Sequence, residues 1–172
     1  MDILNVLKER RSVKKYKDIM PDDESINKIV EAGLYAACGR GTQGVKFLVV
    51  KNKELVKELG KLNASVMGFD KDPFYNAPVV IVVFANSKNM TYIEDGSLAL
   101  GNMMNEAYSI GIDSCWIHRA KETFESKRGR EIARAYGIED EYVGIGNCIL
   151  GYIDGEFPKT KDRLEGRVVI VE

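Results

Sequence analysis

Apolar residues recur along the chain at two spacings, and these spacings predict the secondary structure. Between Ile26 and Ala37 they fall three and four residues apart, which is the period of an amphipathic helix. The segment 78–85 is instead a continuous run rich in β-branched residues, typical of a strand buried on both faces. The full pattern predicts helices over 2–9, 21–37, 53–63, 92–110 and 123–136, and strands over 45–50, 78–85, 113–117, 144–152 and 167–171. Because the elements do not alternate strictly, the expected fold class is α+β, a mixed central sheet flanked by helices.

Helix 92–110 has an unusually wide apolar surface. Its polar residues share only about a third of the circumference, whereas an ordinary surface helix needs an apolar stripe of little more than about 100°. Two interpretations remain open: a central helix of the monomer core, or a helix covered on one side by its own sheet and on the other by a partner subunit. The carboxylates of Glu94, Asp95 and Glu106 fall in the polar arc and are interpreted as exposed charge.

Both chain ends carry apolar residues that bear on packing. The first helix is expected to be capped by Asp2 and to direct Ile3, Leu4 and Leu7 inward. The predicted strand 167–171 could pair with the sheet edge of a partner. Together with the wide apolar arc, this strand favours a homodimer.

Composition narrows the class of protein. The chain has 172 residues, of which 45% are hydrophobic and 30% charged, typical of one ordinary globular domain spanning 1–172. A net charge of −1 gives no general reason to bind nucleic acid or anionic membranes. No apolar run reaches the roughly 20 residues of a membrane span, and no signal peptide is visible at the start. The expectation is a cytoplasmic protein.

The chain has only three cysteines and one histidine, which limits the metal sites and catalytic mechanisms it can form. The three cysteines, Cys38, Cys115 and Cys148, have apolar neighbours and are expected to be buried and reduced. A structural zinc site is disfavoured because there is no Cys-x-x-Cys and His118 is the only histidine. Hydrolase schemes also need His118, and Cys115 lies three residues away on what should be the opposite side of a strand. No side chain is therefore assigned as catalytic, and no metal is expected.

Two short stretches carry the candidate chemistry. The basic segment, residues 10–16, offers three cations and a hydroxyl within five positions, namely Arg10, Arg11, Ser12 and Lys14. Arginine's fork suits phosphate oxygens, although solvated surface charge near a helix end would give the same composition. The glycine loop, residues 39–44, places three glycines within six residues, which allows close backbone approach to a ligand.

The glycine loop matches Gly-x-Gly-x-x-Gly, but its context differs from a dinucleotide fingerprint. That fingerprint follows a strand and opens a helix, whereas here a helix precedes the loop and a strand follows it. The loop also lacks the Gly-Lys-Ser/Thr ending of a phosphate-binding P-loop. A helix C-cap and connector is the simpler alternative to a ligand-binding loop.

In their order along the chain, these pieces resemble the nitroreductase family, whose members bind flavin mononucleotide. The resemblance spans nearly the whole chain and rests on the basic segment, the loop through Gln43 to Phe47, and Asn76 to Val83, followed by Asp95 to Asn102, Gly111 to Ile117, and Gly146 to Tyr152. It implies an α+β sandwich forming an intertwined homodimer with two flavins at the interface.

The resemblance also implies which residues hold the flavin. The phosphate and ring edge would contact Arg10, Arg11, Ser12 and Lys14, with Lys161 and Arg163 as a second phosphate pair. The partner subunit would supply Cys38, Gly39, Arg40, Gly41 and Gln43. The backbone of Ile117, His118 and Arg119 would face the reactive edge of the ring, and Asn63 its pyrimidine side.

The implied activity is ping-pong hydride transfer. NADH or NADPH would reduce the flavin, and an electron-poor small molecule such as a nitroaromatic or quinone would reoxidise it. His118 is the only candidate proton donor. The family's Pro-Trp pair after the loop glutamine is replaced by Gly44-Val45, which alters the expected pocket. Alternatives are a flavoprotein with other chemistry, such as flavin breakdown or reductive dehalogenation, and a non-catalytic protein that binds a phosphorylated ligand.

Overall fold

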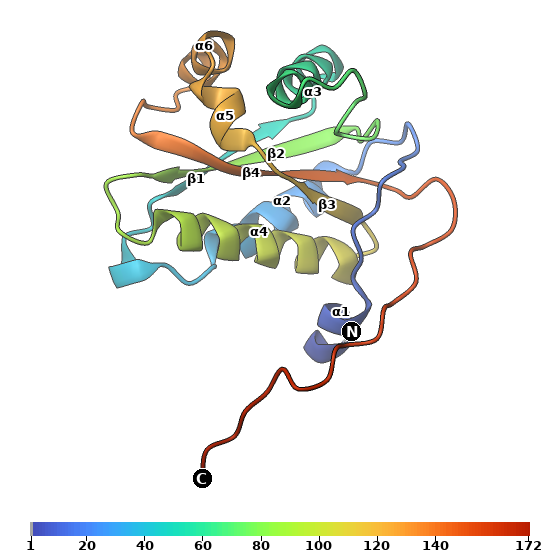
Figure 1. The fold of residues 1–172 in the computed structure, drawn as a ribbon. Coiled ribbons are helices and arrows are strands. Elements are labelled where there is room, and N and C mark those ends of the chain that lie inside the picture. Colours follow the sequence, from blue (N-terminus) through green and yellow to red (C-terminus); the bar gives the residue numbers. More distant parts are fainter. Residues whose placement is uncertain (1) are drawn as a thin grey trace.

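A four-stranded sheet forms the centre of the protein in a computed structural model that describes residues 2–172 (Figure 1). The strands are β1 (Val45–Val50), β2 (Val79–Asn86), β3 (Asp113–Ile117) and β4 (Tyr142–Gly151), in the order β1-β2-β4-β3. All three strand pairs are antiparallel, and one parallel bridge joins Ser12 to Ser114. Strand β3 is therefore an edge strand, and the N-terminal segment runs beside it.

Helices cover both faces of the sheet, which confirms the expected α+β sandwich (Figure 1). The helices are α1 (Ile3–Glu9), α2 (Asp23–Leu34), a 3₁₀ turn η1 (Gly39–Gly41), α3 (Lys53–Met67), α4 (Tyr92–Ser109), α5 (Ala120–Glu125) and α6 (Lys127–Ala135). One face carries α2 and α4, and the other carries α3, α5 and α6 (Figure 1). Among these helices none is long and apolar enough to cross a membrane.

The strand β2 separates two apolar cores, as its continuous hydrophobic run predicts. Val80, Val82 and Phe84 join the core beneath α3, α5 and α6. The alternating residues of β2, such as Ile81 and Val83, join the core beneath α2 and α4. Because successive side chains of a strand leave opposite faces, a strand covered on both faces must be apolar throughout.

Three predicted helix boundaries are wrong, and capping residues explain two of them. The helix expected over 123–136 is two helices, since Ser126 has extended backbone and its side chain accepts the Gly129 N–H at 3.1 Å. The second helix ends at Leu34 rather than Ala37, and Leu34 is exposed. Helix α3 runs four residues beyond its predicted end, to a left-handed cap at Gly68.

The first helix packs differently from the prediction. Ile3, Leu4 and Leu7 are 77%, 54% and 49% exposed, and only Val6 is buried. Asp2 stands at the cap position, but its side chain makes no capping hydrogen bond. The apolar face of α1 thus has no cover from residues 2–172.

The C-terminal tail, residues 155–172, is extended and exposed. The strand predicted over 167–171 does not form within the described chain, because that segment lies against no other strand. Its residues Val168 to Val171 are 79% to 91% exposed. The tail passes α1 and then projects away from the body of the protein (Figure 1).

Candidate functional site

The basic segment is fixed by backbone pairing on both sides. Val13 donates its N–H to the Ser114 carbonyl at 3.1 Å, at the start of β3. Lys17 donates to the Tyr152 carbonyl at 2.8 Å, and the Lys15 ammonium pairs with Asp154 at 2.7 Å where the chain leaves β4. The predicted cations are therefore carried on a rigid strip of backbone rather than on a free surface loop.

The cations of this segment gather around one buried thiol. Burial raises the pKa of Cys115, while a hydrogen bond from Ser12 and the positive charges of Lys14 and Arg10 oppose that rise. Of the four predicted site residues on the segment, Arg10, Ser12 and Lys14 thus lie near one point beside β3. Burial also raises the pKa of Cys148 to about 12, so neither core thiol is a nucleophile at neutral pH. All three cysteines are free, and Cys38 is only half-buried.

Arg11 has a different environment from Arg10. Its guanidinium donates to the carbonyls of Arg10 and Lys8, each at 2.6 Å, and to the hydroxyl of Thr160 in the tail. The tail is held at a second point by the Tyr108 ring, which lies 5.8 Å from the ring of Phe157. These contacts bring the part of the tail that precedes Lys161 and Arg163 beside the basic segment.

The glycine loop has a strained backbone. Arg40, Gly41 and Gln43 all have positive φ angles, of 55°, 65° and 49°. A left-handed conformation is costly for residues with a Cβ, so surrounding contacts must hold Arg40 and Gln43. The Cβ position of Gly41 faces open space within this chain, which leaves that side of the loop free for another molecule.

Asp95 supplies one of those contacts, and the prediction that its carboxylate is exposed is wrong. The residue is only 3% exposed, and its Oδ1 accepts the Gly39 N–H at 2.9 Å. Its Oδ2 accepts a hydrogen bond from the Thr91 hydroxyl at 3.2 Å. Asp95 sits at the border of the polar arc of α4, where the glycine loop folds over it. A buried carboxylate in that position fixes the loop to the helix.

Replacing Asp95 with alanine should lower the free energy of unfolding by about 2 kcal/mol, because the half-buried Gly39 N–H loses its charged acceptor. Urea denaturation measures this change. Glu94→Ala is the matched control, since Glu94 is the exposed neighbour in the same helical turn. Equal destabilisation by both substitutions would show that Asp95 does not hold the loop.

The glycine loop and the basic segment lie at opposite ends of α4. The loop contacts Asp95 in the first turn, whereas Tyr108 near the other end donates to Glu9 of α1 at 3.2 Å. Thirteen residues separate Asp95 from Tyr108, which corresponds to roughly 20 Å along a helix. One chain therefore does not bring both predicted halves of the site together.

The β3–α5 turn, residues 117–119, is held from below by three polar side chains. Asn147 donates to the Ile117 carbonyl at 3.1 Å, Asn63 to the His118 carbonyl at 2.8 Å, and Thr123 to the Arg119 carbonyl at 2.7 Å. The donors come from β4, α3 and α5, and each is at most 2% exposed. Arg119 is left-handed, with φ 68°, and its guanidinium lies on the Met67 thioether.

These three hydrogen bonds determine which backbone groups of the turn remain available to a ligand. In a trans peptide the N–H points away from the carbonyl of the same unit. With the carbonyls of Ile117 and His118 directed inward, the N–H groups of His118 and Arg119 point outward, and they have no hydrogen-bond acceptor within residues 2–172. Exposed His118 lies at the same turn.

The family resemblance predicts that Asn63 contacts the flavin, whereas no sequence pattern predicts a role for Asn147 or Thr123 in the site. The structure buries Asn63, and both hydrogen bonds of its amide nitrogen go to the turn and to Thr123. A signal for Asn147 was available, since it is the only amide side chain in the otherwise apolar stretch 145–151. A buried polar residue in a central strand needs a partner, and here the partner is the site backbone.

Comparison with known proteins places these features in a family. The model of the "Nitroreductase family" matches residues 7–68 and 65–152, which together cover most of the chain. A relative from Archaeoglobus fulgidus, named "Putative NADH dehydrogenase/NAD(P)H nitroreductase", is 30% identical over 169 residues, covering 94% of this chain and 92% of the relative.

Two solved structures have the same fold over their whole length. A nitroreductase with bound FMN from Bacteroides fragilis is 28% identical with a TM-score of 0.92, and one from Desulfitobacterium hafniense is 26% identical with a TM-score of 0.88. Each alignment covers 100% of both chains. This protein belongs to the nitroreductase family.

Proposed function

We propose that this protein is an FMN-dependent oxidoreductase that passes hydride from NADH or NADPH to an electron-poor small molecule such as a nitroaromatic or quinone. Family membership and the FMN-bound relatives support a flavin oxidoreductase. The name of the archaeal relative supports a reduced nicotinamide as donor. The chemistry of the proposed site supports the same activity.

The observation that carries the proposal is the outward pair of N–H groups in the β3–α5 turn. Three buried side chains lock the carbonyls of this turn, so the N–H groups of His118 and Arg119 are preorganised donors. When bound, the flavin would supply the hydride-accepting and hydride-donating ring. The turn would orient that ring and donate to its heteroatoms, a role that needs no side-chain acid or base.

The phosphate end of the ligand fits the basic segment. Arg10, Ser12 and Lys14 lie together beside β3, and the tail brings Lys161 and Arg163 toward the same end of α4. These residues offer the cations and hydroxyl that a phosphate monoester requires. Arg11 is already engaged by carbonyls, so we assign it to holding the tail in place.

A homodimer completes the site in this proposal. The glycine loop of one chain lies roughly 20 Å along α4 from its own basic segment, so a partner's loop would cover the flavin. Exposed apolar side chains on α1, at the end of α2, on α4 and the loop before it, and in the tail would form the interface: Ile3, Leu4, Leu7, Leu34, Tyr35, Met90, Ile93, Leu98 and Val168 to Val171. Such a concentration of exposed apolar surface is typical of protein interfaces.

Arg10→Ala should raise the FMN dissociation constant at least about tenfold, because loss of one charge-assisted phosphate contact costs roughly 1.5–3 kcal/mol. Titration followed by flavin fluorescence measures this change. Lys15→Ala is the control, since Lys15 is on the same segment but pairs with Asp154. FMN affinity unchanged by Arg10→Ala would remove Arg10 from the site.

Bleaching of bound flavin by NADH and by NADPH, followed by a screen of acceptors that restore its colour, tests the proposed reaction.

A further inference from the structure

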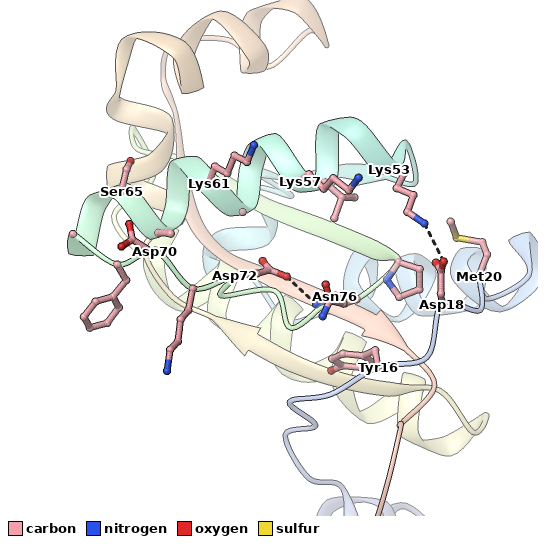
Figure 2. A pocket seen from close by; sticks show the side chains of 18 residues that line it. Tyr16, Asp18, Met20, Lys53, Lys57, Lys61, Ser65, Asp70, Asp72 and Asn76 are labelled. Carbon is pink, nitrogen blue, oxygen red and sulfur yellow. Dashed lines mark hydrogen bonds and ion pairs between the residues drawn. The ribbon is translucent and has the colours of Figure 1, made fainter.

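A cavity runs along α3. Its volume is about 980 Å³, at the upper end of the range for small-molecule sites. It lies between α3, the loop that leads from α3 to β2, and the segment from Tyr16 to Met20 (Figure 2). None of the residues predicted to bind flavin lines it.

Two parallel stripes of α3 give the cavity its character. Val56, Gly60, Ala64 and Gly68 recur every four residues, and their small side chains leave an apolar floor. Lys53, Lys57, Lys61 and Ser65 form the adjoining stripe and line the rim (Figure 2). The buried residues Tyr16 and Ala77 line the opposite wall of the cavity.

The opposite wall is preformed. Asp72 accepts the N–H groups of Phe74 and Asn76 at 2.9 and 2.8 Å, and these bonds hold Tyr75 and Asn76 at positive φ angles of 53° and 61°. The loop also approaches α3 closely at Gly60, where an added Cβ would lie 2.9 Å from Asp72 Oδ1. A ligand would therefore enter a slot that needs little rearrangement.

The charges that line the cavity are unevenly neutralised. Lys53 pairs with Asp18 at 2.9 Å and closes one end (Figure 2), and Lys57 pairs with Glu54 at 3.4 Å. Lys61 and Lys71 make no ion pair within residues 2–172. The carboxylate of Asp72 is occupied by backbone N–H groups, and Asp70 lies on the loop side across from the lysine rim (Figure 2).

From this arrangement we infer that the α3 cavity binds an amphipathic organic anion, with its apolar body against Val56, Ala64 and Ala77 and its carboxylate or phosphate at Lys61 and Lys57. The floor excludes a purely polar ligand, and the free ammonium of Lys61 favours an anion over a neutral molecule of the same shape. None of the residues assigned to flavin above lines this cavity, and Tyr16 at the end of the basic segment borders it.

Phenyl phosphate, phenylacetate and benzyl alcohol form a matched set of probes for this site. We would add each, up to about 10 mM, to the ¹⁵N-labelled 172-residue chain saturated with FMN, and follow the amide signals of Gly60 and Gly68. At least one anion should shift these signals and bind about fivefold more tightly than benzyl alcohol. The anion that binds more tightly shows whether the site prefers a phosphate or a carboxylate. Equal binding of all three probes would overturn the assignment of an anionic ligand.

Two variants test the location. Lys61→Gln should reduce anion binding to the level of benzyl alcohol, whereas Lys121→Gln on α5 should not. Ala64→Trp should fill the slot and abolish binding of all probes, and a retained amide spectrum would show that it folds. Because Lys61 is on the surface, its variant remains informative if Ala64→Trp does not fold. No shift at α3 with any probe, or shifts confined to His118 and Arg119, would overturn the proposal.

Discussion

The double substitution Val169→Asp and Val171→Asp should convert the proposed homodimer into monomers. These residues are 84% and 91% exposed in the single chain, at the end of an extended tail with free backbone groups. Paired with the sheet edge of a partner, each valine would bury enough apolar surface to contribute roughly 1.5–3 kcal/mol. Charged replacements should raise the dimer dissociation constant at least about 100-fold, measured by sedimentation velocity.

The tail offers its own control. Lys159→Asp places the same charge on the same exposed segment without removing apolar surface, so it should leave the dimer intact. FMN binding should fall with dimerisation, because the glycine loop of the partner would leave the site. A wild-type chain that binds FMN as a monomer at micromolar concentration would contradict both the interface and the shared site.

Heterodimers of a Gly41→Val chain with an Arg10→Ala chain should bind one flavin, not two. Gly41 has a φ of 65°, a conformation that valine adopts at a cost of roughly 1–2 kcal/mol, so this loop should be displaced while the core remains. If each site combines the basic segment of one chain with the glycine loop of the other, the heterodimer has one undamaged site. Its second site carries both substitutions.

Differently tagged chains would allow the heterodimer to be purified, and flavin per dimer would then be measured by absorbance. Each homodimeric variant provides a reference with two singly damaged sites. A half-occupied heterodimer would support a site shared across the interface. Two equally weakened sites would mean that each chain binds flavin with its own loop, which the separation along α4 does not favour.

The sequence by itself determined the elements whose cause is local. The strands 45–50 and 113–117 have the predicted bounds, and the continuous run near 78–85 is buried on both faces as predicted. The order of helix, glycine loop and strand was also readable, because boundaries depend on nearby residues and caps. Family membership followed from motifs spread along the chain, and the family comparison confirms it.

The tertiary structure decided what covers each face. Helical periodicity places Asp95 at the border of a polar arc, but only the glycine loop folding over α4 buries it and makes it an acceptor. The same holds for Asn63 and Asn147, whose partners are carbonyls distant in sequence. By contrast, Ile3, Leu4 and Leu7 form the predicted apolar face of α1, yet no part of the described chain covers this face. Amphipathic pattern reports which residues share a side; contacts between distant segments determine whether that side meets core, solvent or another subunit.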